Sequence, residues 1–571
     1  MPSVIIEQEQ KVLAKALQKK VGVFKCLVPG TIEYSRAVFI GNLNYRMTMP
    51  AIIVVARTVE DVQATVVFAR QNGVRLTVKN GGHSYMGYCL NEGGIVLDLE
   101  KLNGCSIDTD EMTITMEGGC IWKDVYYKLL QNCPENIIIG GQCPTVGVSG
   151  FTLGGGLSPF SRSYGLGCDN VIEMTIVTAD GELVTVSAED TDEKKRDLFW
   201  ALRGGGGGNF GITVEFKSKI HRLQDSRGRV VCGSLQWDLT NDEQKQDFDH
   251  MMHAFNTTSW PDELCIDALW NYDAAGNLQG GLTVIFNGTA KKAYDVLRPL
   301  LEYGPTSNTL KQMHWTDWVH QAEGWDPKSE VYHHHASFIF AEGAITPEVN
   351  QKISNLVKEA ASHLNIKNGT QLNAPKCHVL WDHVGGATER VEATDTPYFW
   401  RKGHYVSTVK AQWTDPAKSE EAMEFIAKCK KELLPYAIEH KAAYLNYIDG
   451  TVGNWEEAYY GHNYPRLQKV KSDWDPDNFF WNMQSVRPLK DGKAKTIKDE
   501  VSVPSLKVLL NSHEATQTLE WWKRYSVLVT PRALGVIKSD EQAYAQDSTI
   551  RQHLIASNCE EDRNLADKRF L

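Results

Sequence analysis

The chain has 571 residues, which predicts more than one domain because single hydrophobic cores rarely exceed about 300 residues. Its formal net charge of −11, with no long basic run, argues against a nucleic-acid partner. No stretch reaches about 18 consecutive apolar residues, which excludes a transmembrane helix.

The N-terminal segment, residues 1–20, lacks the basic and apolar blocks of a secretory signal, and its apolar spacing is typical of an amphipathic helix. The twelve cysteines form no CxxC pair, which argues against a zinc site and a dense disulfide scaffold. We therefore expect an intracellular protein located in the cytoplasm.

Residues 51–82 are predicted to form a strand, a helix and a second strand. The strands, 52–56 and 74–78, are rich in β-branched residues, and 59–73 has helical periodicity that ends at a glycine. The second strand leads into Lys79-Asn80-Gly81-Gly82-His83-Ser84, a turn whose N–H groups would suit a pyrophosphate. A single histidine such as His83 is, by itself, more typical of a surface or hydrogen-bonded side chain.

The most glycine-rich stretch is 140–170, where nine of 31 residues are glycine and apolar residues lie between them. Glycine allows backbone N–H groups to approach a phosphate or a flat ring, so the stretch predicts a cofactor-binding surface rather than a linker. Around it we expect strands at 95–99 and 112–119, a helix at 122–131 and a hairpin at Asp180-Gly181. Residues 1–222 are therefore predicted to be α+β and to face a cofactor.

From residue 223 to 449 glycine becomes rarer, and helices predicted at 291–302, 348–364 and 418–437 alternate with strands such as 281–287. This pattern predicts a second domain in which helices cover a sheet, and the aromatic residues either form its core or wall a ligand cavity. Residues 450–489 return to a glycine- and asparagine-rich composition. Residues 490–571 are an appended tail that we expect to pack on the body or on another subunit.

Common nucleotide and metal motifs do not fit the sequence. Gly154-Gly155-Gly156 is not followed by the helix that a GxGxxG dinucleotide site needs, and the Gly-Lys-Ser/Thr of a P-loop is absent. His333-His334-His335 would point to alternating faces of a strand, so the run is no ready set of metal ligands.

Several colinear segments between residues 30 and 490 have another match. They are 79–84, Gly141-Gln142-Cys143-Pro144-Thr145-Val146-Gly147, 153–156, 162–165, 169–170, 208–212, Asn463-Tyr464-Pro465-Arg466-Leu467, 475–479 and 484–485. Together they resemble the berberine bridge enzyme-like FAD oxidases of the vanillyl-alcohol oxidase family. The resemblance implies an α+β fold. A two-part FAD-binding domain of the PCMH type (1–222, with 450–489 returning to it) would accompany a substrate domain (223–449) with a mainly antiparallel sheet covered by helices.

The resemblance also implies FAD held by two covalent bonds. In such enzymes the histidine after Gly-Gly bonds to the flavin 8α-methyl group and the cysteine bonds to C6, and His83 and Cys143 stand at these positions. The other residues implied in FAD binding are Lys79, Asn80, Gly81, Gly82, Ser84, Gly147, Gly150, Gly154, Gly155, Gly156, Gly165, Asp169, Gly211, Ile212, Asn463 and Tyr464.

Two positions carry the implied chemistry. A valine three residues after the cysteine resembles the oxidases of the family, so Val146 implies reoxidation of the flavin by O₂. Tyr447, in a segment expected to be a strand, matches the base of carbohydrate-oxidising and cannabinoid-cyclising members. A phenol with its ordinary pKa of about 10 is a weak base at neutral pH, and a nearby cation, for which Lys410 is a candidate, would lower that pKa. Core tyrosine is the alternative for Tyr447.

Other members use a glutamate on the strand before a Gly-Gly, and the matching position here is Trp381, so that base is lacking. We expect Trp381, His383 and Tyr85 to line the substrate pocket instead. Core packing of Trp381 and a solvated His383 are the alternatives.

The first interpretation is an FAD-linked oxidase that takes hydride from a small organic alcohol or reactive C–H of a specialised metabolite, with or without ring closure, and reduces O₂ to H₂O₂. The second is an oligosaccharide oxidase that acts at the anomeric carbon. The third is a flavin-loaded scaffold that catalyses a non-redox cyclisation or only binds its ligand. The expected partners are a small molecule and O₂, without nucleic acid or membrane, and the tail is the expected route to an oligomer.

Overall fold

The structure is a computed structural model that describes residues 25–322, 331–367, 374–490 and 493–494, with isolated helical positions at 12, 15–17 and 19. All of these belong to the first of the chain's two units, residues 1–509. The predicted tail lies outside the described residues, except for the short pair β20 (Leu489–Lys490) and β21 (Lys493–Ala494). Within the described ranges, no helix is long and apolar enough to cross a membrane.

The first sheet contains the predicted strand–helix–strand unit, and its strand order is β1-β2-β4-β3. Its elements are β1 (Lys25–Leu27), β2 (Ile52–Val55), α3 (Val59–Gln71), β3 (Leu76–Lys79) and β4 (Ile95–Asp98). β2 and β3 both pair in parallel with β4, which lies between them. α3 begins at a capping box in which the Thr58 hydroxyl accepts from the N–H of Asp61 and the Asp61 carboxylate accepts from that of Thr58.

The second sheet is antiparallel, with the order β5-β6-β10-β8-β9. Its strands are β5 (Cys105–Asp108), β6 (Thr113–Glu117), β8 (Val171–Val177), β9 (Leu183–Ser187) and β10 (Ile212–Lys219), and its helices are α4 (Trp122–Asn132), α5 (Val148–Leu153) and α7 (Glu193–Leu202). The predicted strands at 95–99 and 112–119, the helix at 122–131 and the hairpin at Asp180-Gly181 are confirmed.

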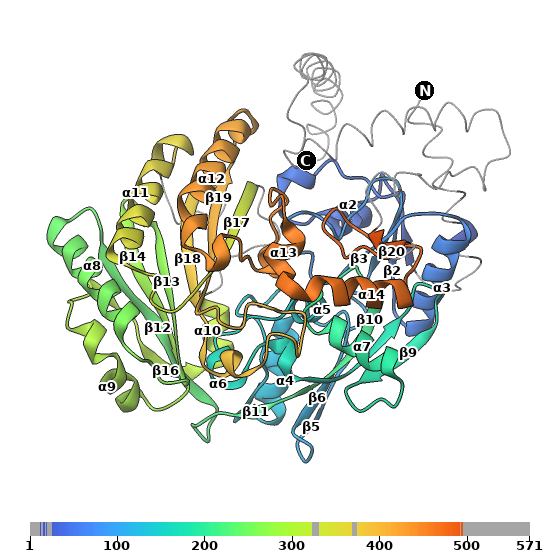
Figure 1. Cartoon of the computed structure of the whole chain (residues 1–571), viewed down its shortest axis with the longest axis horizontal. Helices are drawn as coiled ribbons and strands as arrows, with labels where there is room; N and C mark the ends of the chain where they lie inside the picture. The colour runs from blue at the N-terminus through green and yellow to red at the C-terminus, as the bar shows by residue number, and fades with distance from the viewer. Residues whose placement is uncertain are drawn as a thin grey trace, which may run out of the picture. The chain divides into compact units, whose positions relative to one another are not determined.

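The third sheet is the largest, and all of its strand pairs are antiparallel. Its strands are β12 (Arg229–Asp238), β13 (Leu264–Tyr272), β14 (Leu278–Phe286), β15 (Ser307–Asn308), β16 (Lys311–His314), β17 (Tyr332–Phe340), β18 (Lys376–His383) and β19 (Tyr405–Trp413). One face is covered by α8 (Asp242–Thr257), α9 (Ala290–Leu301), α11 (Pro347–His363) and α12 (Ser419–Leu433), as Figure 1 shows. The chain is therefore α+β, as predicted.

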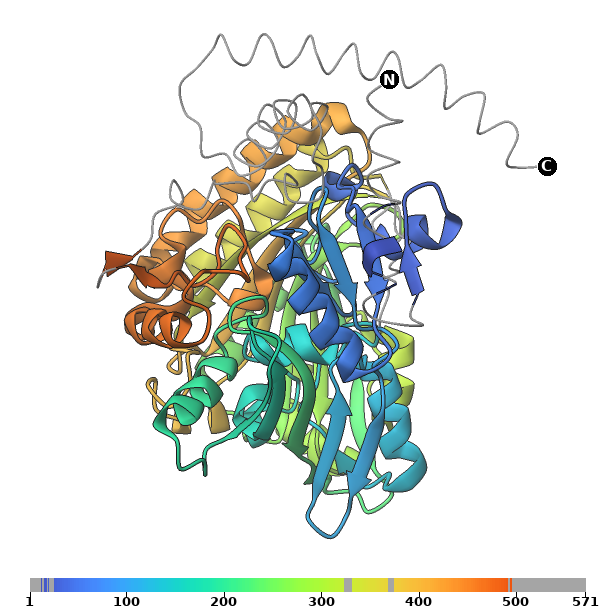
Figure 2. The ribbon, with the colours of Figure 1, turned by 90° about the vertical axis from the view of Figure 1, so that its right-hand side faces the viewer.

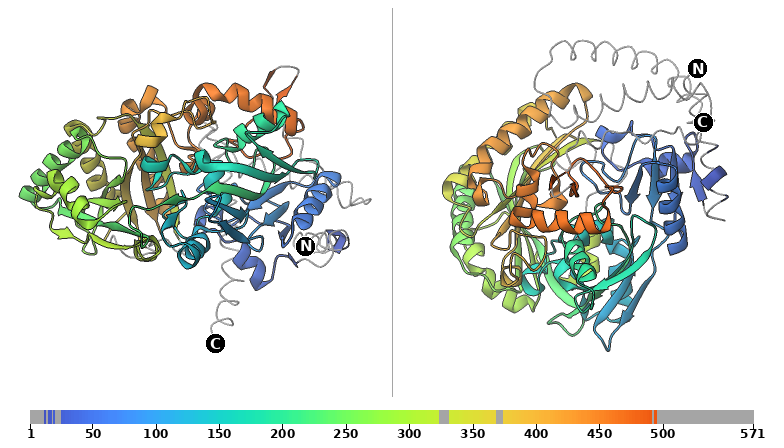
Figure 3. Two further views of the ribbon diagram at one scale, coloured as in Figure 1. Left: turned by 90° about the horizontal axis from the view of Figure 1, so that it is seen from below. Right: turned by 45° about the vertical axis from the view of Figure 1, so that its right-hand side comes forward.

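Alternation along β18 decides which side chains reach the site. Positions 377, 379, 381 and 383 are buried, three of them in the core beneath the helices, whereas 376, 378, 380 and 382 are half-buried on the other face. Because successive side chains of a strand point to opposite faces, the second set faces the two smaller sheets. Figure 3 shows this arrangement, with the large sheet and its helices in green to orange beside the smaller sheets in blue to teal.

The C-terminal part of the described chain packs on the N-terminal part. α14 (Tyr464–Trp474) contacts α7, where Arg466 pairs with Asp197 at 2.8 Å and the Trp474 indole N–H donates to the Lys194 carbonyl. Figure 2 shows the orange-red helix beside the teal segment. The domain boundaries at 222 and 449 stay predictions.

Candidate active site

A cavity of about 500 Å³ is lined by residues of all three sheets. The turns 80–85 and 141–151 and the glycine run 206–208 form one part of its lining. Strands β13, β14 and β18 form another, and segments 444–448 and 480–484 complete it. Segments that are distant in sequence therefore meet at one chamber.

Two of the glycine-containing turns pack backbone to backbone. A Cβ at Gly81 would lie 2.6 Å from both the nitrogen of Gly147 and the carbonyl oxygen of Thr145, so only glycine fits there. The Asn80 side chain joins the same two turns by accepting from the N–H of Ser149 at 3.2 Å. This close approach fixes the position of His83 relative to Cys143.

His83 and Cys143 converge on one hydroxyl. His83 Nε2 lies 3.0 Å, and Cys143 Sγ 3.6 Å, from Thr145 Oγ1. Burial and, to a smaller extent, the charge of Lys410 lower the pKa of His83 to about 3, so the imidazole is neutral near pH 7. A neutral imidazole and a thiol, both nucleophiles, thus lie together in the lining of the cavity.

Glycine backbone forms part of this wall. A Cβ at Gly150 would have no atom within 4 Å, and at Gly207 or Gly208 its nearest neighbour would be 3.9 Å away. The hydroxyl of Thr213 in the same lining is buried and makes no hydrogen bond to another described residue. Open glycines, an unsatisfied hydroxyl and the two nucleophiles fit a flavin dinucleotide, which offers a flat ring and phosphate oxygens.

Two carboxyl groups of the large sheet, those of Asp267 and Asp382, line the cavity. The Tyr447 hydroxyl donates to Asp382 Oδ2 at 2.8 Å, and Asp267, on the neighbouring strand, accepts from the backbone N–H of His383 at 3.2 Å. Burial raises the pKa of Asp267 to about 6. Burial also raises the pKa of Asp382 well above its usual range, and the nearby Asp267 raises it further. The two acids can therefore hold a proton near neutral pH.

Two expectations about Tyr447 are wrong. Residues Leu445–Tyr447 form a 3₁₀ turn rather than a strand. Burial and the adjacent Asp382 raise the pKa of Tyr447 well above its ordinary value, so the surroundings do not prepare the phenol as a base. Asp382 is the group beside Tyr447 that can accept a proton.

Trp381 does not line the cavity. Its indole is fully buried in the core and stacks on Phe340 at 4.2 Å, because its place in β18 turns it toward the helices. The neighbouring Asp382 faces the cavity instead. The period-two pattern of residues 376–383 indicated that positions 381 and 382 point to opposite faces of the sheet. The match of Trp381 to the family's glutamate position nevertheless led to the prediction of Trp381, rather than Asp382, as a lining residue.

Tyr85, Val146 and His383 belong to the lining. The His383 ring is buried rather than solvated, and its Nε2 lies 3.0 Å from Arg162 Nη1. Its backbone N–H donates to Asp267.

Eight residues expected to bind FAD lie outside the lining and have other partners. Lys79 pairs with Asp98 at 2.6 Å, and the N–H of Gly156 donates to the Tyr444 hydroxyl. Asp169 pairs with Arg401 at 2.7 Å, and Asn463 donates to the carbonyls of Ala393 and Thr396. The eight are Lys79, Gly154, Gly155, Gly156, Gly165, Asp169, Asn463 and Tyr464. The other predicted residues line the cavity: His83, Cys143, Asn80, Gly81, Gly82, Ser84, Gly147, Gly150, Gly211 and Ile212.

Fold and cavity together define the class as an FAD-binding oxidoreductase. Residues 50–187 match the model of the FAD binding domain, and residues 443–487 match the model named berberine and berberine like. By these matches and by its relatives, the chain is similar to the berberine bridge enzyme-like FAD-linked oxidoreductases.

Relatives cover most of the chain. The FAD-linked oxidoreductase YgaK of Bacillus subtilis is 27% identical over 79% of this chain and 94% of its own. Berberine bridge enzyme-like 22 of Arabidopsis thaliana is 26% identical over 78% of this chain and 86% of its own. The structure of Physcomitrella patens BBE-like 1 has a TM-score of 0.71 at 26% identity and covers 84% of this chain and 99% of its own.

Proposed function

We propose that the protein is an oxidase with bicovalently bound FAD, which oxidises a small organic alcohol or reactive C–H and passes the electrons to O₂. One observation carries the proposal: a single cavity holds His83 and Cys143, converging on Thr145, and the hydrogen-bonded pair of Tyr447 and Asp382. The nucleophiles suit attachment of a flavin, and the acid pair suits proton removal from a substrate.

Two covalent bonds are testable without a substrate. His83 would bond to the flavin 8α-methyl group and Cys143 to C6. Acid-precipitated protein should then retain its yellow colour, and His83→Ala and Cys143→Ala should each retain it through the other bond. Only the double variant should release all FAD into the supernatant. Complete release from the unaltered protein refutes the covalent attachment.

FAD, when bound, supplies the acceptor for the hydride that leaves the substrate carbon. The chain supplies the proton acceptor: Asp382, in its ionised form, takes the substrate's hydroxyl proton, either directly or through the Tyr447 hydroxyl, which donates to it at 2.8 Å. The hydride and the proton would thus be taken up by different groups, and the alcohol carbon would become a carbonyl.

Reoxidation by O₂ is supported by Val146, which lines the cavity beside Cys143. A relative 26% identical to this chain is named tetrahydroberberine oxidase, from Argemone mexicana. Stopped-flow mixing of reduced enzyme with O₂ should restore the oxidised spectrum with stoichiometric H₂O₂. Val146→Ile should slow this phase, because the added methylene narrows access, and should leave anaerobic reduction unchanged. An equal rate in the variant refutes the role of Val146.

A screen of candidate substrates distinguishes the remaining proposals for the substrate. A specialised metabolite, oxidised with or without ring closure, is the first candidate. An oligosaccharide oxidised at its anomeric carbon is the second, favoured by the hydroxyl-binding groups Asp267, Thr283 and Asp382 on one wall. Peroxide release across a panel of alcohols, phenols and sugars decides between them. If no compound bleaches the flavin under nitrogen, the oxidase proposal fails in favour of a non-redox scaffold.

A further inference from the structure

A group of basic side chains on the large sheet takes no part in the proposed reaction. We call it the basic cluster: His333 and His335 of β17, Lys376 and His378 of β18, and Lys410 of β19. Lys410 pairs in register with His335 on one side and with His378 on the other, while His333 and Lys376 both pair with Gln412. Directly paired residues of antiparallel strands point to the same face, so all five share one face of the sheet.

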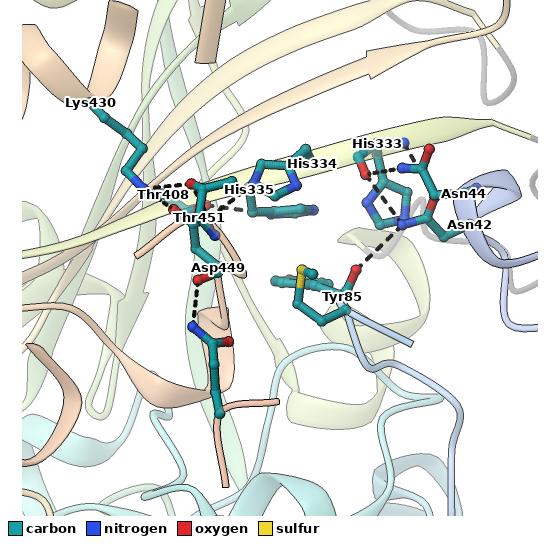
Figure 4. Close-up of polar contacts among 12 residues, drawn as sticks. Asn42, Asn44, Tyr85, His333, His334, His335, Thr408, Lys430, Asp449 and Thr451 are labelled. Atoms are coloured by element: carbon teal, nitrogen blue, oxygen red, sulfur yellow. Dashed lines mark hydrogen bonds and ion pairs between the residues drawn. The ribbon is translucent and has the colours of Figure 1, made fainter. Parts of the chain in front are cut away.

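That face is the one turned toward the cavity. His378 and Lys376 lie on the same side of β18 as Leu380 and Asp382, which line the cavity. Tyr85, another lining residue, stacks on His335 with ring centroids 3.7 Å apart and planes 11° from parallel. Figure 4 shows this stack, with His333 beside it and His334 turned away toward Asp449. The basic cluster therefore adjoins the cavity through Tyr85 and Leu380.

The imidazoles of the cluster are neutral hydrogen-bonding groups. Burial lowers the pKa of His378 to about 3 and holds the pKa values of His333 and His335 well below the ordinary range, and the charge of Lys410 adds to each shift. The basic groups of the cluster other than histidine are thus Lys410 and Lys376, and burial lowers the pKa of Lys376 from its ordinary value.

Two buried nitrogens of the cluster lack hydrogen bonds. His333 Nδ1 and His335 Nε2 have no partner among the described residues, although both side chains are more than nine-tenths buried. A buried polar atom without a partner is costly, and most such atoms in folded proteins are satisfied by protein, water or a ligand. This pair marks a place where a polar group from outside the chain would be stabilised.

The face of the large sheet that is turned toward the cavity carries acidic and basic groups at different ends. Asp267 and Asp382 lie at one end, and the basic cluster lies at the other. Asp382 and His378 are four residues apart on β18, which corresponds to about 13 Å along the strand. A molecule that reaches both ends must be elongated, and its two ends must differ in charge.

We propose that the basic cluster binds a carboxylate of the substrate, so that the enzyme oxidises the far end of an elongated carboxylic acid placed at Asp382. This inference rests on the proposed function only in its statement of which end of the substrate is oxidised. Binding itself does not depend on any turnover. Lys410 supplies the charge, and the imidazoles of His335 and His378 on either side of it supply hydrogen bonds.

The test uses two probes of matched shape, 4′-(hydroxymethyl)biphenyl-4-carboxylate and the corresponding carboxamide. Titration calorimetry on the holoenzyme measures their dissociation constants without oxidation. The carboxylate should bind at least about tenfold more tightly than the amide, which corresponds to about 1.4 kcal/mol. Equal affinities, or tighter binding of the amide, overturn the proposal. Bleaching of the flavin by the same carboxylate under nitrogen is a separate readout for the proposed function.

Variants then assign the preference to the cluster. Lys410→Met keeps the length of the side chain and removes its charge, so it should abolish the preference for the carboxylate and leave the amide affinity within about twofold. Lys410→Arg should retain the preference. The control is Lys431→Met, which removes one exposed charge from α12. If Lys410→Met weakens both probes equally, or if the preference survives it, the carboxylate is not bound by this cluster.

Discussion

Replacing Asp267 by asparagine should change the pH dependence of flavin reduction while leaving Asp382 and Tyr447 in place. Asp267 and Asp382 lie on neighbouring strands, one step beyond the registered pair Ala268 and Trp381. Asparagine keeps an oxygen that can accept from the N–H of His383. The substitution therefore removes a charge and preserves the local hydrogen bond.

The size of the effect follows from the spacing of the two strands. Cross-strand neighbours are about 5 Å apart, and two unit charges at this distance repel by about 3 kcal/mol at an effective dielectric constant of about 20. One pKa unit corresponds to about 1.4 kcal/mol, so loss of Asp267 should lower the pKa of Asp382 by about 1 to 2 units. Asp382 must be ionised to accept a proton. The increase in the rate of flavin reduction with pH should therefore occur at a pH that is lower by this amount.

The assay is the rate of anaerobic flavin bleaching by a saturating substrate, measured by stopped flow across pH 5 to 9. Thr283→Val is the control, because Thr283 pairs with Asp267 across β13 and β14 but carries no charge. Its profile should match that of the unaltered enzyme. If the rate of the Asp267→Asn variant rises over the same pH range as that of the unaltered enzyme, the two carboxyl groups do not share a proton. The assignment of Asp382 as the proton acceptor would then lose its electrostatic support.

Three further outcomes are expected. Tyr447→Phe should slow anaerobic flavin reduction by about 100-fold with little change in substrate affinity, and a normal rate would remove Tyr447 from proton transfer. Gly207→Leu should fold with a normal far-UV spectrum but lack FAD absorbance, because its side chain would enter the open cavity, whereas Gly453→Leu should bind FAD normally. Asp449→Asn should lower the free energy of unfolding in urea by about 3 kcal/mol, since Asp449 is fully buried against Lys430 and His334. Those contacts hold the pKa of Asp449 below its unfolded value of about 4, so the stability difference should be present above that pH and shrink as pH falls below it.

Local pattern was sufficient for much of the fold. The strands at 52–56 and 74–78, the helix between them, and the helices near 291–302 and 348–364 are found close to their predicted bounds. In each of these elements, the signal is a periodic spacing of apolar residues, a helix cap or a terminal glycine that belongs to the element itself. Neighbours along the chain therefore determine its conformation. The turn at Leu445–Tyr447 was missed because its 3₁₀ conformation depends on contacts with distant segments, among them Phe151 and Asp382.

The sequence motifs were sufficient to select His83, Cys143 and the cavity glycines, and the structure brings them into the lining of one cavity. The sequence alone did not decide which wall residue is the proton acceptor. Trp381 and Asp382 are adjacent, and only the register of β18 against β13 and β19 shows that the carboxylate faces the cavity. The raised pKa of Tyr447 and the gathering of Lys410 with three histidines likewise arise from burial and cross-strand pairing. Charge, burial and facing direction are properties of segments brought together from separate parts of the chain, and so the tertiary structure decided them.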